Sequence, residues 1–169
     1  MPIAEHITSS TPYASKDDFC RIFNQEKVEL YLLSYLLTAN REKAEQCFIS
    51  GLEDSVKGNS VFKEWARSWA RRAIIQCAIR VINPRPMEEG APSTLNSRGH
   101  TWPVEWEEIA AVLELGPFER FVYVMSVLER YSIQDCSVLL GYARRDVVEA
   151  RIRALQQIGS AAELTLSAS

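Results

Sequence analysis

The side chains with the clearest capacity for chemistry are arginines, and they gather in two segments far apart in the sequence. In the first segment, residues 132–155, two short helical patterns meet at Gly141. Two helices joined by a tight turn are typical of a helix-turn-helix, whose second helix enters the major groove of DNA. Guanidinium groups there bind phosphates and guanine edges. The candidate DNA contacts in this segment are Arg144, Arg145, Arg151 and Arg153.

The second segment, residues 62–85, is both basic and aromatic. It has six cationic side chains against the single acid Glu64. Exposed aromatic side chains beside cations stack on unpaired nucleic-acid bases, and each stacked base contributes about 1–3 kcal/mol to the binding free energy. The helical spacing favours a core position for Trp69 and leaves Trp65 open to a core or a base-stacking role. The cations are Lys63, Arg67, Arg71, Arg72, Arg80 and Arg85. A solvated helix face with weak ion pairs explains Lys63, Arg67 and Arg71 about equally well.

The rest of the composition argues against an enzyme and against a metal centre. The four cysteines are isolated, with no Cys-x-x-Cys pair, and the chain has only two histidines. We expect all four cysteines to be small buried hydrophobes. No nucleophile–base pairing or glycine-rich phosphate loop is evident, so we predict neither catalytic residues nor a cofactor.

Charge and hydropathy limit the partners and the location of the chain. No apolar run approaches the roughly 20 residues that cross a bilayer, and the first residues do not resemble a signal peptide. We therefore expect a cytoplasmic protein without membrane insertion.

The net charge is -3 over 169 residues. Residues 103–120 contain five glutamates against Arg120, which predicts a solvated acidic face that points away from DNA.

Apolar periodicity predicts an all-α fold, with two small helical domains joined by a flexible linker and a C-terminal helix-turn-helix. Pro84 and Pro86 must end a long helix, and the stretch that follows is rich in Pro, Gly and Ser. We expect helices over 15–37, 42–56, 61–82, 104–113, 118–130, 133–140 and 144–158. The predicted organisation is a disordered N-terminus (1–14), a helical domain (15–83), a linker (84–103), a helix-turn-helix domain (104–159) and a frayed tail (160–169).

Within the helix-turn-helix, apolar side chains should pack the two helices against the preceding one. We expect Leu139, Leu140, Val147 and Ile152 to contact Phe121, Val124 and Val127.

The order of these segments resembles the small two-domain bacterial sigma factors of the extracytoplasmic-function group, over residues 30–158. The stretch 31–45 is similar to the opening helix of that family and its turn. Phe62-x-x-Trp65, followed by Ala70-Arg71, resembles the family's Phe-x-x-Trp…Ala-Arg segment. Residues 115–120 and 153–155 resemble the Leu-Pro-x-x-x-Arg start and the Arg-Ala-Leu end of the second domain.

The resemblance implies a promoter-recognition subunit of RNA polymerase. Its N-terminal domain would bind a coiled coil of the polymerase core and open the downstream promoter element, and its C-terminal domain would read the upstream element. By position, the residues facing polymerase would be Gln46, Phe48, Ile49 and Leu52. Those facing the melted promoter DNA strand would be Lys63, Arg67, Arg71 and Arg72, and those facing duplex DNA would be Arg144, Arg145 and Arg151.

The sequence departs from the family at several of these contacts. Ile49-Ser50 stands where the family has Gln-Glu, and Arg72 where it has Asn. Glu149 and Ala150 replace contact residues of the reading helix. These changes motivate an alternative, a sigma-like decoy or adaptor that binds an anti-sigma factor without binding promoters. In such a decoy, arginine restored at positions 149 and 150 should raise DNA affinity.

Overall fold

The computed structural model describes residues 11–58, 60–86 and 107–167, with side chains as far as residue 161. Helices account for the regular structure of these ranges, which confirms the all-α prediction for the described part of the chain. One isolated antiparallel bridge joins Tyr13 to Phe62. Within the same ranges, no helix is both long enough and apolar enough to cross a membrane. Nearly all of the predicted linker lies outside the described residues.

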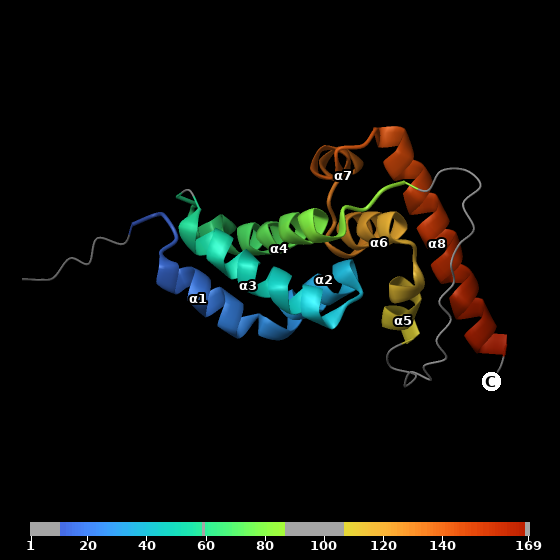
Figure 1. Cartoon of the computed structure of the whole chain (residues 1–169), viewed down its shortest axis with the longest axis horizontal. Helices are drawn as coiled ribbons and strands as arrows, with labels where there is room; N and C mark the ends of the chain where they lie inside the picture. The colour runs from blue at the N-terminus through green and yellow to red at the C-terminus, as the bar shows by residue number, and fades with distance from the viewer. Residues whose placement is uncertain (1–10, 59, 87–106, 168–169) are drawn as a thin grey trace, which may run out of the picture.

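Four helices form the N-terminal half, and α4 lies against the other three (Figure 1). Leu30, Leu37, Ile74 and Ile75 are fully buried between them. Gly51 permits a close approach of two helices, because a Cβ atom there would lie 2.7 Å from Cγ1 of Ile74. The elements are α1 (Lys16–Gln25), α2 (Lys27–Thr38), α3 (Arg41–Lys57), the short 3-10 turn η1 (Lys63–Trp65) and α4 (Ala66–Ile82).

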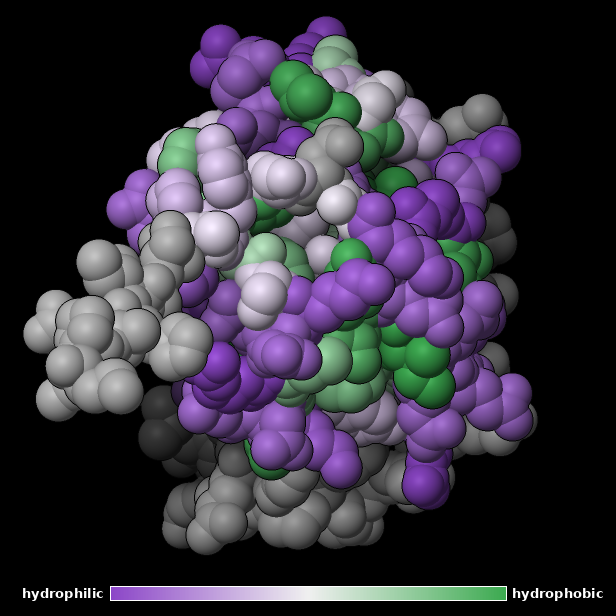
Figure 2. All heavy atoms as spheres, turned by 90° about the vertical axis from the view of Figure 1, so that its left-hand side faces the viewer, coloured by the Kyte–Doolittle hydropathy of each residue, from purple (hydrophilic) through white to green (hydrophobic). Residues whose placement is uncertain are grey.

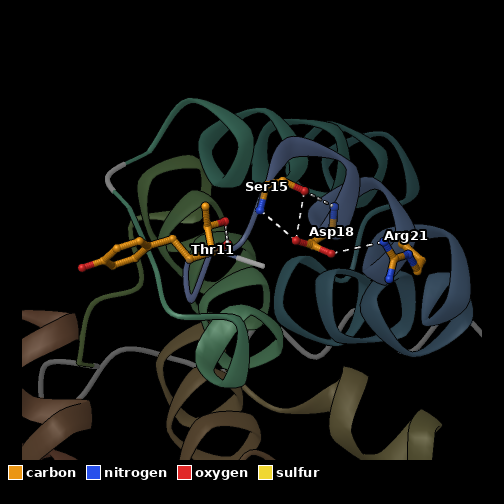
Figure 3. Close-up of polar contacts among 5 residues, drawn as sticks. Thr11, Ser15, Asp18 and Arg21 are labelled. Carbon is orange, nitrogen blue, oxygen red and sulfur yellow. Dashed lines mark hydrogen bonds and ion pairs between the residues drawn. The ribbon is translucent and has the colours of Figure 1, made fainter. Parts of the chain in front are cut away.

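The first predicted helix, 15–37, is in fact two helices that meet at Glu26. A capping box begins α1, as Figure 3 shows: the Ser15 hydroxyl accepts from the amide of Asp18, and the Asp18 carboxylate accepts from the amide of Ser15. Arg21 donates to the same carboxylate one turn later. Glu26 then has a non-helical backbone, which changes the direction of the chain into α2. Apolar spacing cannot reveal such a break because the buried residues continue on both sides of it.

The C-terminal half is built on α6 and α8, which pack against each other through Phe118, Phe121 and Val147. The predicted helix 118–130 changes into a π-helix and ends at Leu128, two residues before Arg130, whose φ is 58°. The last helix continues to Ser167, beyond the end expected near Ile158. The elements are α5 (Glu107–Glu114), α6 (Pro117–Tyr123), the π-helix η3 (Val124–Leu128), α7 (Ile133–Leu140) and α8 (Arg144–Ser167).

The two halves share one apolar core, since α2 packs against α5, α6 and η3. A buried arginine crosses the junction: Nε of Arg120 donates to the carbonyl of Leu37 at 3.3 Å, and Nη1 donates to the carbonyl of Leu115 at 3.0 Å. Burial lowers the pKa of Arg120 to about 10, so the group stays protonated at neutral pH. The expectation of a wholly solvated face over 103–120 is therefore wrong at Arg120 and at the buried Glu119.

Candidate nucleic-acid interface

Three aromatic side chains form an exposed cluster where α4 begins. The rings of Tyr13 and Phe62 stack at 4.9 Å between centroids, and Phe62 meets Trp65 edge-on at 5.3 Å. Trp65 is 58% exposed. Figure 2 looks onto this end of the molecule and shows apolar and weakly polar side chains set among hydrophilic ones. Trp69, for which spacing favoured the core, is 36% exposed and lies at the surface, near Gly58 at the end of α3.

Backbone contacts fix the position of this aromatic cluster. The amide of Ala14 donates to the carbonyl of Val61 at 2.7 Å, and the amide of Lys63 donates to the carbonyl of Pro12 at 2.9 Å. The capped start of α1 thus lies directly beside η1. The amide and hydroxyl of Ser15 lower the pKa of Asp18, and the nearby cations Lys63 and Arg21 lower it further. Segments 12–15 and 61–65 consequently form one surface.

The predicted basic ridge of α4 is largely engaged by acids from other elements. Nε of Arg67 lies 3.1 Å from Oε1 of Glu26, and Nη2 of Arg80 donates to Asp54 at 3.0 Å. Nη1 of Arg71 donates to Glu129 at 2.7 Å. Arg72 is half-buried near Tyr131, whereas Lys63 is exposed beside the aromatic cluster. Lys63 is thus the exposed cation beside the aromatic rings, while Arg67 is exposed within its ion pair with Glu26.

The arginines of α8 differ strongly in their surroundings. Arg144 and Arg145 are exposed, and Nε of Arg145 pairs with Glu149 at 2.8 Å. Arg151 is half-buried. Arg153 reaches toward the body of the protein and pairs at 3.0 Å with the buried Glu119. These four side chains thus do not share one face, although they are close in sequence.

The outer side of α8 also bears apolar side chains. Val148, Ile152 and Leu155 are all exposed there, at spacings of four and three residues. The prediction that Ile152 packs inside the helix pair is wrong, since this side chain is 50% exposed. Ala150 is fully buried and cannot face DNA, which corrects its assignment to the reading face. Leu140 and Val147 do belong to the core, as expected.

The four residues assigned to polymerase fall into two groups on α3. Gln46 and Ile49 are exposed on the outer side of the helix. Phe48 packs edge-on against Phe23 at 5.3 Å, and Leu52 packs against the core. Only the first pair can meet a partner without disturbing the N-terminal half.

Three of the four cysteines are buried. Burial raises the pKa of Cys47 to about 12 and that of Cys136 to about 11, which keeps both as thiols. Cys77 is also buried, but Cys20 is exposed, so the expectation of four buried cysteines is wrong for one. In the described ranges no cluster of His, Cys, Asp and Glu side chains could hold a metal ion.

Sequence reasoning missed Tyr13 and Glu129 as members of these surfaces. Tyr13 reaches the aromatic cluster through a β-bridge, and Glu129 reaches Arg71 across 58 positions of the chain. No local pattern signals either contact.

No protein-family model matches the chain, and no curated protein matches it significantly.

Proposed function

We propose that this chain is a divergent bacterial sigma factor of the extracytoplasmic-function type, a non-catalytic subunit that brings RNA polymerase core to promoters in the cytoplasm. The observation that carries the proposal is the exposed aromatic cluster of Tyr13, Phe62 and Trp65 beside Lys63. Aromatic faces stack on unpaired bases of any type, while neighbouring cations bind the strand's phosphates. Such a surface suits the single strand of a melted promoter.

The other parts of the proposal have separate supports. Gln46 and Ile49 offer an exposed polar and apolar pair for polymerase on α3. The α7 and α8 helices, joined at Gly141 with a φ of 75°, have the connection that a helix-turn-helix requires. In this proposal α8 reads duplex DNA through Arg144 and Arg145. The two halves act as separate domains when the protein spans a promoter.

Competition for sigma-free polymerase core tests the proposal. Saturable competition with a fluorescent housekeeping sigma factor is expected, and Ile49→Asp should weaken it by placing a charge on the binding face. Val28→Asp is the matched control, because Val28 is an exposed apolar side chain on a different helix. Absence of competition at micromolar protein would overturn the sigma-factor proposal.

One observation favours the alternative, a sigma-like adaptor that binds an anti-sigma factor. The apolar outer face of α8, formed by Val148, Ile152 and Leu155, suits a protein partner better than phosphates. Glu149 lies beside this face. In an adaptor that has lost promoter binding, Glu149→Arg should raise the affinity for duplex DNA, whereas Ala150→Arg would disrupt the core. Promoter binding by the wild-type protein in complex with core would contradict the adaptor.

A further inference from the structure

The exposed apolar side chains of α8 lie on one straight line along the helix. Val148, Ile152 and Leu155 are separated by four and three residues, and each is at least 41% exposed. Gly159 follows after four more residues, and no atom lies within 4 Å of the position that its Cβ would take. Alternating spacings of four and three residues are those with which helices pair in coiled coils. We call residues 148, 152, 155 and 159 the α8 seam.

In the described ranges, α8 packs against the rest of the chain through other positions. Val147, Ala150 and Ala154 are fully buried, and the contacts of α8 are with α5, α6 and α7. Figure 1 shows α8 along one edge of the molecule, on the side away from α1 and α3. Three large apolar side chains in line on a free edge favour association with another apolar surface.

Gly159 is the position of the α8 seam that the fold of a single chain does not explain. A glycine inside a helix is less favourable than alanine by about 0.5–1 kcal/mol. Gly159 lies in the interior of α8, its φ is not positive, and its surroundings leave room for a side chain. Its missing side chain leaves a gap in the α8 seam, eleven residues after Val148. A gap of this kind can accept a side chain from a second helix.

A second copy of the α8 seam fits this gap when the two helices run antiparallel. A two-fold axis midway between Ile152 and Leu155 places Val148 of one copy over Gly159 of the other, and the reverse. The same axis places Ile152 of each copy opposite Leu155 of the other, which gives four filled layers. A parallel pair would place Gly159 opposite Gly159 and leave one layer empty, with the loss of its packing contacts.

The charge along α8 favours the same direction. Residues 144–153 contain four arginines against Asp146 and Glu149, whereas Glu163 is the one charged residue of 154–167. Antiparallel pairing brings the basic first half of one helix beside the second half of the other, which contains only an acid. Parallel pairing would bring the two basic halves together, where like charges repel each other.

We propose that the α8 seam is the contact surface of a homodimer in which the α8 helices of two copies pack antiparallel. The inference does not depend on the proposed function, because it uses only the shape and the charge of α8. Four positions per copy are far fewer than the roughly 20–30 residues per side of a standard interface. We therefore expect a reversible dimer with a dissociation constant on the order of 10–100 µM.

Sedimentation velocity of the full-length protein tests the dimer. The concentration is varied from about 5 to 300 µM, a range that brackets the expected dissociation constant. Ile152→Glu places a carboxylate in an inner layer and should weaken association at least about tenfold, because the charge loses its water. Val138→Glu is the matched control: Val138 is an apolar side chain of α7 that is 67% exposed and lies outside the α8 seam. This control should leave the dissociation constant unchanged.

Gly159→Leu distinguishes the antiparallel from the parallel arrangement. The new side chain has open space in the single chain, so the variant should fold as the wild type does, which circular dichroism checks. In the antiparallel dimer it meets Val148 of the second copy and should weaken association about tenfold, the effect of an overpacked contact. In a parallel dimer it would fill the empty layer and strengthen association.

Cross-linking reports the same arrangement directly. Val148→Cys chains are mixed with Gly159→Cys chains, both with Cys20→Ser, since the remaining cysteines are buried. Oxidised glutathione should join the two kinds of chain to each other more than either kind to itself.

Three outcomes would overturn the inference. A wild-type protein that stays monomeric over the whole concentration range would overturn the homodimer. Equal weakening by Ile152→Glu and Val138→Glu would overturn the α8 seam as its contact surface. Stronger association of Gly159→Leu, or cross-links only between like chains, would overturn the antiparallel arrangement.

Discussion

The start of α4 and the outer part of α8 contain similar residues in sequence but present different surfaces. At the start of α4, Tyr13, Phe62 and Trp65 expose their rings next to Lys63. On α8, Arg153 pairs with the buried Glu119, and apolar side chains are exposed on the outer side. Three arginines further along α4 and Arg153 on α8 are all paired with acids from other elements, so a run of arginines in the sequence does not by itself predict a basic surface.

The largest expected effect is on stability, and it compares the buried Arg120 at the junction of the two halves with the exposed Arg145 on α8. Arg120→Met should lower the free energy of unfolding by about 3 kcal/mol, because the carbonyls of Leu37 and Leu115 lose their buried donor. Arg145→Met on α8 removes an 85% exposed guanidinium and should change stability by less than about 0.5 kcal/mol. Urea denaturation of both variants measures this comparison. Equal losses would contradict a junction anchored by Arg120.

Two separate glycine-to-alanine substitutions compare the packing of α3 against α4 with that of α8. Gly51→Ala should destabilise the protein by about 2 kcal/mol, since the new methyl group meets Ile74 on α4 at 2.7 Å. Gly159→Ala on α8 meets no atom within 4 Å and should stabilise the helix by about 0.5–1 kcal/mol. Thermal unfolding followed by circular dichroism should give shifts of opposite sign. A neutral Gly51→Ala would show that α3 and α4 can separate without cost.

The affinity for single-stranded DNA compares the function of the aromatic cluster at the start of α4 with that of the outer side of α8. Trp65→Ala should weaken binding by about 1 kcal/mol, roughly fivefold, because one stacking face is lost. Ile152→Ala removes a comparably exposed apolar side chain from α8 and should leave this affinity unchanged. Fluorescence anisotropy with a labelled oligonucleotide measures both. A larger loss from Ile152→Ala would transfer the strand-binding surface to α8.

The smallest expected effect is the pH dependence of the α1 cap. Hydrogen bonds from Ser15 lower the pKa of Asp18 below its ordinary value of 3.8 in the folded protein. Its contribution to stability is therefore complete above about pH 4–5 and is lost as the pH falls through the lowered value. Asp18→Asn should remove this part of the acid sensitivity, and NMR titration of the carboxyl group checks the shift. A pKa at or above 3.8 would contradict the capping geometry.

Much of the fold could be predicted because helix limits have local causes. Gly141 ends α7, as the sequence indicated, and the end of α4 at Ile82 follows from Pro84. The break at Glu26 and the π-helix could not be predicted. Apolar periodicity continues through each of them, so the pattern of buried residues does not reveal either irregularity.

The candidate surfaces were only partly predictable for the same reason. Basic and aromatic composition singled out residues 62–85, where both Trp65, which spacing had left open, and Trp69 are exposed. The ion-pair partners of Arg67, Arg71 and Arg153 could not be predicted from the sequence. They are Glu26, Glu129 and Glu119, which come from other elements of the fold.

By itself, the sequence determined the all-helical character, the caps and the order of the helices in the described ranges, since these depend on residues within one or two helical turns. Only the tertiary structure decided which cations stay open to solvent. Charge interactions fall off over a few ångströms, so the state of Arg71 depends on the acid that packing brings beside it rather than on its neighbours in the chain.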